Sequence, residues 1–279
     1  MGKFDGVLLC SDIDATLLLN GVLPEENQKA IKYFQENGGR FTLCTGRYLD
    51  FFDKYAHLVK PNAPVIAMNG TIIVDKETGQ ELYRCPLPAD PGRMTAETLC
   101  ELPYLKAAYV FPKGNSFLVK RTEDNTFEVT IERDMPALKA KNADELNEIF
   151  GYPDKNDIYK VVFTVASEKS DEAKAAIMGR YSEFSVFRSW INGIEVQSPM
   201  ADKGKGARLL ADILGDVRLL VSAGDYENDL AMMEEADIGY AVANAHPAVK
   251  AAADRITKRE CLEGAIAEII YDIEKDLKN

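Results

Sequence analysis

Short apolar runs alternate with amphipathic segments in the first part of the chain. Residues 6–10 form a run without a polar position, which is typical of a strand buried on both faces of a parallel sheet. The segment 23–39 places apolar side chains at helical spacing and ends in Asn-Gly-Gly, a helix stop signal. Further strands are predicted at 40–44 and 64–67, with a helix through 51–58 between them. This order predicts a parallel sheet with helices on its faces and right-handed crossovers.

The pattern changes between residues 85 and 190. Partly polar, alternating strands such as 107–111 occur there among helices such as 171–180, which indicates a separate α+β unit. The first pattern then returns, with predicted helices at 204–214, 228–235 and the C-terminal end, and predicted strands at 218–222 and 238–242. We therefore predict an α/β protein in which a doubly wound parallel-sheet (Rossmann-like) core, residues 1–84 and 191–279, is interrupted by an inserted α+β cap domain, residues 85–190.

The composition is that of an ordinary globular protein, with 46% hydrophobic and 28% charged residues. A formal net charge of -12 argues against nucleic acid and anionic membrane surfaces as partners, because clustered Lys and Arg bind those surfaces. An enzyme this acidic needs a local concentration of positive charge to bind any anionic substrate. A metal ion, a lysine and helix N-termini can provide one.

The five cysteines are spread over the chain without a close pair, which does not indicate a disulfide framework. We expect reduced thiols and a cytoplasmic protein. The apolar stretch 7–10 near the N-terminus is too short for a signal peptide or a membrane span, so we expect no association with a membrane.

Two carboxylates, those of Asp12 and Asp14, follow the first predicted strand directly. Ligands of open α/β sheets bind outside the carboxyl ends of the strands, so this position favours a functional site. Like charges at two-residue spacing repel each other, and either a cation between them or a protonated carboxyl would relieve the repulsion. A polar loop or helix cap at the end of a strand is the alternative interpretation.

A second acidic segment, Asp225 to Asp229, lies between a predicted strand and a predicted helix. Asp225 can supply an oxygen to a hard cation, with Asn228 and Asp229 in support, although Asn228-Asp229 alone is an ordinary helix N-cap pair. Taken with Asp12, the two strand ends form an acidic cluster suited to Mg²⁺, which binds one or two carboxylates, waters and substrate phosphate oxygens.

Two further elements offer groups for a phosphate. Thr45-Gly46-Arg47 ends another predicted strand, where a hydroxyl and backbone N–H groups at a helix start can hold phosphate oxygens. Lys203 precedes a predicted helix and can bring a positive charge to a phosphoryl group. Each has a plainer interpretation, since Thr-Gly is often a turn with a capping hydroxyl and lysines near glycines are usually solvated.

In this order the four elements resemble the haloacid dehalogenase-like phosphatases, and within them the Cof-type branch with a large α/β cap between its second and third motifs. The resemblance covers the whole chain. The residues that match the four motifs are Asp12 and Asp14, then Thr45, then Lys203, and finally Asp225 with Asn228 and Asp229. Asn69-Gly70 resembles the Asn-Gly loop beside the site of this branch. One position departs from the pattern, because Ala15 stands where the family has Gly, which costs roughly 1 kcal/mol if that residue takes a positive φ.

The resemblance implies a role for each of these positions. Asp12 attacks phosphorus, and Asp14 protonates the leaving oxygen and later activates water. The residues implied in substrate binding are Thr45, Gly46, Arg47, Asn69, Lys203 and Asn228. Mg²⁺ is the implied cofactor, and its implied ligands are Asp12, Asp14 through the carbonyl oxygen, and Asp225, with Asp229 in support. A carboxylate nucleophile divides one difficult step into two, and the metal offsets the repulsion between two anions.

We therefore expect a Mg²⁺-dependent phosphatase that hydrolyses small phosphate monoesters, sugar phosphates above all, through an aspartyl-phosphate intermediate. A cap over the strand ends would leave little room for a macromolecule, so we expect a small phosphorylated metabolite as partner. We also expect a monomeric or homodimeric protein. A phosphomutase of the same superfamily is the closest alternative. A phospho-accepting signalling protein is another, although such receivers are usually short single domains. No Gly-x-Gly-x-x-Gly follows the first strand, which disfavours a nicotinamide enzyme.

Overall fold

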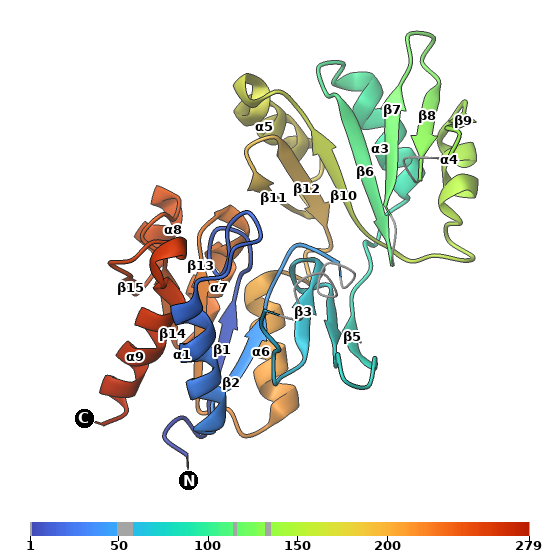
Figure 1. Ribbon diagram of the computed structural model, residues 1–279. Coiled ribbons are helices and arrows are strands. Elements are labelled where there is room, and N and C mark those ends of the chain that lie inside the picture. The colour runs from blue at the N-terminus through green and yellow to red at the C-terminus, as the bar shows by residue number, and fades with distance from the viewer. Residues whose placement is uncertain (1, 49–57, 114–115, 132–134, 279) are drawn as a thin grey trace. The chain divides into compact units, whose positions relative to one another are not determined.

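The computed structural model describes residues 2–48, 58–113, 116–131 and 135–278 (Figure 1). The chain forms two compact units, the first from residues 1–84 and 201–279 and the second from residues 85–200. The helix predicted through 51–58 lies outside the described residues except for its last position.

A five-stranded parallel sheet forms the centre of the first unit, in the order β15-β14-β13-β1-β2. Its strands are β1 (Val7–Ser11), β2 (Arg40–Leu43), β13 (Leu219–Gly224), β14 (Ile238–Ala241) and β15 (Arg255–Ile256). Every residue of β1 is buried, as the apolar run at 6–10 predicted for Val7 to Cys10, and Ser11 at its end is buried too. This arrangement confirms the predicted doubly wound α/β core.

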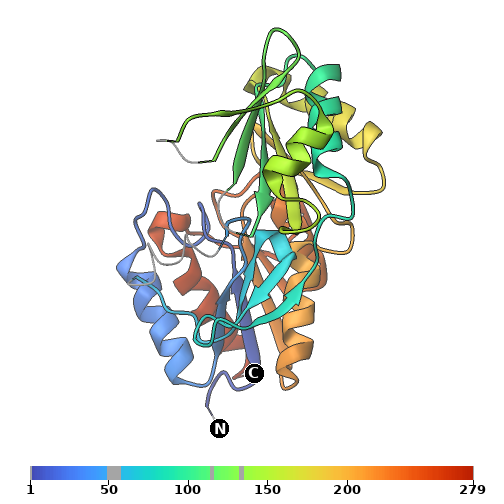
Figure 2. The same ribbon diagram turned by 90° about the vertical axis from the view of Figure 1, so that its right-hand side faces the viewer.

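Helices cover both faces of this sheet (Figure 2). On one face, α1 (Glu25–Glu36) and α9 (Ala265–Asp276) share an apolar cluster with Leu9 of β1. On the other face, α6 (Lys203–Leu214) and α7 (Leu230–Glu235) share a cluster with Leu8. Because side chains of a strand alternate between the two faces, the four apolar residues that begin β1 supply both clusters, and only its last residue, Ser11, is polar. A short helix, α8 (Pro247–Ala252), precedes β15.

The predicted strand at 64–67 departs from the parallel pattern. It belongs to a three-stranded antiparallel sheet of β3 (Val65–Ala67), β4 (Ile72–Val74) and β5 (Glu81–Arg84). A single parallel bridge between Cys44 and Ile66 joins β3 to the chain that follows β2. The backbone reverses within a single 3₁₀ turn, η1 (Met68–Gly70), so β4 runs back along β3 instead of crossing over through a helix.

Strand β13 extends two residues beyond its predicted end at 222 and stops at Gly224. The Ser222 hydroxyl donates to the Met232 carbonyl at 2.8 Å, so this polar side chain is satisfied inside the fold. Asp225 therefore follows the last residue of the strand directly.

The second unit contains a seven-stranded antiparallel sheet in the order β11-β12-β10-β6-β7-β8-β9. Its strands are β6 (Ala107–Pro112), β7 (Phe117–Arg121), β8 (Phe127–Thr130), β9 (Leu138–Ala140), β10 (Ile158–Thr164), β11 (Ser185–Trp190) and β12 (Gly193–Gln197). Its helices are α3 (Pro91–Glu101), α4 (Ala143–Phe150) and α5 (Ser170–Arg180). Apolar side chains of the three helices and of the sheet form one cluster, which is the core of this unit.

The second junction between the units differs from the predicted one. The sequence pattern assigns residues 191–200 to the first unit, whereas β12 pairs with β10 and β11 in the second. Ile194 and Val196 face the apolar cluster of the second unit, and Glu195 between them forms a buried ion pair with Lys160 at 2.7 Å. This alternation fits an antiparallel sheet, and a strand of only five residues was too short to separate from a core strand by its pattern.

Candidate active site

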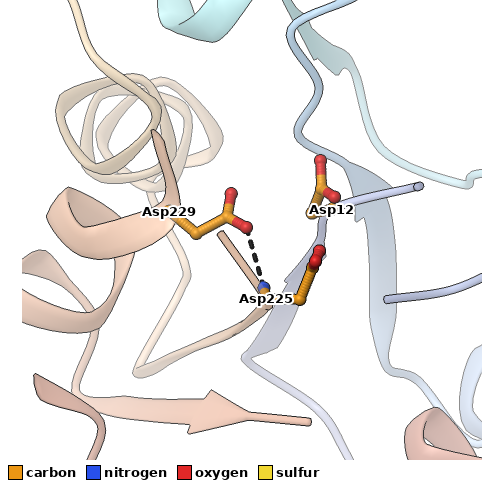
Figure 3. A group of neighbouring side chains, drawn as sticks. All are labelled: Asp12, Asp225 and Asp229. Carbon is orange, nitrogen blue, oxygen red and sulfur yellow. Dashed lines mark hydrogen bonds between the residues drawn. The ribbon is translucent and has the colours of Figure 1, made fainter. Parts of the chain in front are cut away.

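Asp12 and Asp225 emerge side by side from neighbouring strands of the first unit. Ser11, the last residue of β1, pairs with Ala223 of β13, and the backbone N–H of Asp12 donates to the Ala223 carbonyl at 2.9 Å. Oxygens of Asp12, Asp225 and Asp229 all lie within 4.8 Å of one another (Figure 3). The parallel sheet thus brings together acidic residues from opposite ends of the chain.

The ammonium group of Lys203 lies inside this acidic cluster. Its Nζ is 2.6 Å from Asp12 Oδ1 and 2.6 Å from Asp229 Oδ1, and the side chain is 0% exposed. Burial alone would lower the pKa of Lys203, but the attraction of the two carboxylates raises it, so the lysine stays charged. The alternative of a solvated surface lysine is thereby excluded.

Close packing at the start of α6 carries Lys203 into the interior. The Asp202 side chain caps the helix by accepting the N–H of Lys205 at 2.7 Å. A Cβ atom at Gly204 would lie 2.1 Å from the Ala231 carbonyl oxygen of α7, so only glycine allows the two helices to approach this closely. The glycine beside Lys203 therefore has a packing role that places the lysine.

The cluster holds three carboxylates and one ammonium group. Burial raises the pKa of Asp12 well above its ordinary value; Lys203 opposes this effect, and Asp229 and Asp225 add to it. Burial, followed by the charge of Asp229, raises the pKa of Asp225 to about 7. When all three carboxylates are ionised, two negative charges remain uncompensated in a poorly hydrated place. A divalent cation would neutralise them, so the donor set fits a hard metal ion.

Asp229 holds the cluster together and is the carboxylate least available to a metal ion, because both of its oxygens accept hydrogen bonds from the protein. Its Oδ1 accepts from Lys203, and its Oδ2 accepts the backbone N–H of Asp225 at 2.8 Å. In the described part of the chain, Asp12 and Asp225 each use one oxygen, Asp12 for Lys203 and Asp225 for the Thr16 hydroxyl at 2.8 Å. Asp12 and Asp225 are therefore the carboxylates that fit a cation best.

The Asp14 carboxylate is not a member of this cluster. Arg47 binds it with two hydrogen bonds, from Nε to Oδ2 at 2.6 Å and from Nη2 to Oδ1 at 2.8 Å. The charge of Asp14 still reaches the cluster, because it contributes to the raised pKa of Asp225. The metal contact expected through the Asp14 carbonyl oxygen stays a prediction.

Thr45 and Gly46 lie just after β2, next to the turn η1 that follows β3. Thr45 is buried, its N–H donates to the Ile66 carbonyl at 2.9 Å, and its hydroxyl oxygen accepts the N–H of Arg47 at 3.1 Å. A Cβ atom at Gly46 would lie 2.9 Å from Asn69 Oδ1, so glycine allows the two loops to approach. Their expected role in phosphate binding stays a prediction.

The turn η1, which follows β3, has an unusual backbone. Met68, Asn69 and Gly70 have φ values of 52°, 54° and 86°, so three successive residues are left-handed. Each non-glycine residue in this region costs of order 1–3 kcal/mol, and such strain persists where the surroundings impose it. Asn69 donates its N–H to the Thr45 carbonyl at 2.9 Å, and Asn228 Nδ2 donates to Asn69 Oδ1 at 3.2 Å. Asn69 thus links the loops that follow β2 and β13.

Ala15 has a φ of 60°, the left-handed conformation in which the family's glycine is favourable. The loop is held by two hydrogen bonds at this residue: the Ala15 N–H donates to the Leu18 carbonyl at 2.8 Å, and Asn244 Nδ2 donates to the Ala15 carbonyl at 2.8 Å. Asn244 and Thr16 are contacts of the site that sequence reasoning missed. Thr16 stands in the first motif and could have been found there, whereas no local signal marks Asn244.

Residues 9–270 match the family of haloacid dehalogenase-like hydrolases. The chain belongs to this family. The predicted membership and the prediction of a hydrolytic enzyme are thereby confirmed. In the described part of the chain, no helix combines the length and the apolar character needed to cross a bilayer.

Two phosphatases and a solved structure are similar to the chain over most of its length. The 5-amino-6-(5-phospho-D-ribitylamino)uracil phosphatase YwtE of Bacillus subtilis (strain 168) is 28% identical over 277 residues, covering 88% of this chain and 91% of that protein. A phosphoglycolate phosphatase of Methanosarcina acetivorans is 28% identical over 224 residues, covering 76% of this chain and 97% of that protein. A solved haloacid dehalogenase-like hydrolase from B. subtilis has the same fold, with a TM-score of 0.75 at 22% identity over 95% of this chain and 98% of that one.

The left-handed backbone at Ala15 generates a prediction about stability. We expect Ala15→Gly to raise the free energy of unfolding by about 0.5–1 kcal/mol, because relief of the strain outweighs the greater freedom of glycine in the unfolded chain. Activity should change only modestly. Urea unfolding measures the effect, with Ala175→Gly in α5 as the control, since glycine at that exposed helical position should lower stability by about 1 kcal/mol. If Ala15→Gly and Ala175→Gly lowered the free energy of unfolding equally, the backbone at Ala15 would not be strained.

The raised pKa of Asp225 generates a prediction about pH. An acid whose folded pKa, about 7, lies above the ordinary 3.8 destabilises the fold when ionised, so metal-free protein should lose stability as pH rises between these values. Asp225→Asn should remove about 1–3 kcal/mol of that loss, since one pKa unit corresponds to about 1.4 kcal/mol. Urea unfolding in chelator at about pH 4.5 and about pH 7.5 measures it. If the wild type and Asp225→Asn lost the same free energy of unfolding between the two pH values, the pKa of Asp225 would not be raised.

Proposed function

We propose that the protein is a Mg²⁺-dependent phosphatase that hydrolyses small phosphate monoesters through an aspartyl-phosphate on Asp12. The observation that carries this proposal is the buried Lys203 ammonium, held 2.6 Å from Asp12 and from Asp229 beside the Asp225 carboxylate. A lone buried ion pair would need one carboxylate. Three carboxylates around one lysine, at the carboxyl ends of parallel strands, suit a site that receives both a cation and an anionic substrate.

Asp12 is the residue suited to attack phosphorus. The Lys203 contact keeps one carboxylate oxygen fixed and favours the ionised form, which leaves the other oxygen as the nucleophile. As Asp12 bonds to phosphorus, the bond from phosphorus to the ester oxygen breaks, and that oxygen takes a proton from Asp14. Water then attacks the phosphoryl group and gives a proton to Asp14, which releases inorganic phosphate and restores the Asp12 carboxylate.

Asp12 and Asp225 would hold Mg²⁺ through their carboxylates, and the Asp14 carbonyl is the third expected ligand from the chain. When bound, the ion would neutralise charge on the phosphate and on the nucleophile, which otherwise repel each other. Lys203 contributes a fixed positive charge in the same place. The net acidity of the chain is then no obstacle, because the attraction that a small anion feels is local.

The phosphate oxygens would be held by groups at the ends of β2 and β3. The Thr45 hydroxyl uses its oxygen to accept from Arg47, so its proton is available for a phosphate oxygen. The Gly46 backbone and the side chains of Asn69 and Asn228 lie in the same set of loops. We propose these residues as the substrate-binding group, with Lys203.

The proposed substrates are small phosphorylated metabolites, with sugar phosphates as the first candidates. The two phosphatases compared above are named for a phosphorylated ribityl compound and for phosphoglycolate, two small monoesters with different carbon skeletons. A panel of phosphorylated metabolites with phosphate release as the readout tests this proposal. A folded phosphoprotein hydrolysed faster than every small ester of the panel would contradict it.

All five cysteines are free thiols, which suits the reducing conditions of the cytoplasm. A cytoplasmic location and a monomeric or homodimeric state complete the proposal. Cell fractionation and light scattering measure them directly.

Removing the nucleophile tests the mechanism. Asp12→Asn should reduce phosphate release by at least about 10³-fold and abolish acid-stable phosphoenzyme, because an amide cannot attack phosphorus. Asp212→Asn in α6 is the matched control, since this exposed residue lies on the same helix as Lys203 and outside the site. Turnover within about tenfold of the wild type in Asp12→Asn would exclude the aspartyl-phosphate route.

Activity should also depend on the metal. We expect turnover to require Mg²⁺, to disappear with a chelator and to return when Mg²⁺ is added in excess. Ca²⁺ should inhibit, because its larger and more flexible coordination lets a carboxylate bind through both oxygens, which would remove the attacking oxygen of Asp12. Steady-state phosphate release with each ion measures these effects. Undiminished hydrolysis in chelator would contradict the metal requirement.

A further inference from the structure

Asp14 and Arg47 form a two-point ion pair at the ends of adjacent strands. Asp14 follows β1 and Arg47 follows β2, and both guanidinium hydrogen bonds to the carboxylate are short, at 2.6 and 2.8 Å. The two side chains are 51% and 45% exposed, so solvent screens the attraction between their charges. The contact is consequently more important for geometry than for stability.

The backbone on each side of this pair is fixed. The Arg47 N–H donates to the Thr45 hydroxyl at 3.1 Å, and the Arg47 carbonyl accepts the N–H of Met68 at 3.1 Å. On the other side, Ala15, which follows Asp14, is held by Leu18. A guanidinium presents its donors in a planar fork, so two hydrogen bonds to one carboxylate also set the plane of that carboxylate. Arg47 therefore determines the direction in which the Asp14 oxygens point.

We propose that Arg47 is a positioning residue for Asp14, and not the ligand of substrate phosphate that the sequence led us to expect. The inference rests on the proposed function, in which Asp14 gives a proton to the leaving oxygen. One of the two hydrogen bonds opens so that an Asp14 oxygen can face the ester oxygen, and the other keeps the carboxyl group in place. The proton passes from Asp14 to the departing oxygen as the bond from phosphorus to oxygen breaks, and Arg47 remains charged throughout.

Lys203 already provides a positive charge for the substrate phosphate, so the site does not need Arg47 as a second phosphate-binding cation. Lys203 is fully buried and touches Asp12 at 2.6 Å, whereas Nε and Nη2 of Arg47 donate to Asp14. A phosphate that replaced Asp14 as the partner of Nε and Nη2 would break both hydrogen bonds to Asp14. The residue that transfers the proton would then lose its support at the moment when the leaving group departs.

A positioning role predicts a dependence on the leaving group. An alkyl alcohol is a poor leaving group and needs the proton, whereas p-nitrophenolate departs without one, so only alkyl esters depend on the placement of Asp14. We expect Arg47→Gln to lower kcat/KM for an alkyl phosphate by about 10- to 100-fold, part of the 10²–10⁴-fold that general acid catalysis supplies. For p-nitrophenyl phosphate the loss should stay below about threefold. The parameter kcat/KM is the right measure because it covers the steps up to departure of the leaving group.

The experiment compares Arg47→Gln and four further variants with the wild type on both esters, and titrates each protein with inorganic phosphate by calorimetry. Asp14→Asn should show the same selective loss, and Asp14→Asn combined with Arg47→Gln should lose nothing further. Arg47→Lys should recover part of the activity on the alkyl ester. Arg40→Gln is the control, since Arg40 also binds one carboxylate at two points, through Nη1 and Nη2 to Asp216, near the amino ends of β2 and β13. It should behave as the wild type.

A selective loss on the alkyl ester with unchanged phosphate affinity supports the inference. An equal loss on both esters, no loss on either, or phosphate binding weakened by tenfold or more in Arg47→Gln would overturn it. If the wild type released no phosphate from any ester, the proposed function would fail instead. The phosphate titration would still decide whether Arg47 is a phosphate ligand.

Discussion

The position of one buried positive charge governs the arrangement of the site. The Lys203 ammonium is removed from water, and this is tolerable only because Asp12 and Asp229 both reach it at 2.6 Å. Those carboxylates are buried as well and need the lysine in return. The start of α6, the end of β1 and the loop after β13 must therefore converge on one point, and any displacement of one segment would leave a charge uncompensated in the interior.

The parallel sheet supplies the frame for this convergence. In β1 the residues Val7 to Cys10 are packed among apolar side chains on both faces, the last residue is the small polar Ser11, and the first carboxylate follows directly at Asp12. In β13 the one polar side chain, that of Ser222, is satisfied by the Met232 carbonyl, and the carboxylate again follows the strand, at Asp225. Chemistry thus occurs at strand ends for a simple reason, since only there does a rigid backbone meet space that apolar packing does not fill.

Much of this could be predicted from the sequence, because the relevant signals are local. Apolar runs mark the buried strands, and the polar residues that interrupt them mark the strand ends, so Asp12, Asp225 and Thr45 were found as candidates. Lys203 was found because it precedes a predicted helix. The carboxylate cluster follows from the parallel order of the strands, which the alternation of strands and helices indicates.

The remaining features depend on contacts between distant segments. No local pattern shows that Asn244 holds the loop at Ala15, or that Arg47 turns its guanidinium to Asp14. The second junction was misplaced for a related reason, because Ile-Glu-Val is compatible with a strand of either unit. Only the pairing of β12 with β10 and β11 assigns it.

The left-handed turn at Met68, Asn69 and Gly70 also limits which sequences this protein can accept. Side chains branched at Cβ are strongly disfavoured in that conformation, and at Gly70 a Cβ atom would lie 2.0 Å from the Asp202 carbonyl oxygen. In a library of random variants, this turn should therefore tolerate few substitutions, whatever the assay selects for. Intolerance at position 68 would reflect the shape of the backbone, and it should not be taken as a sign that the methionine side chain meets a ligand.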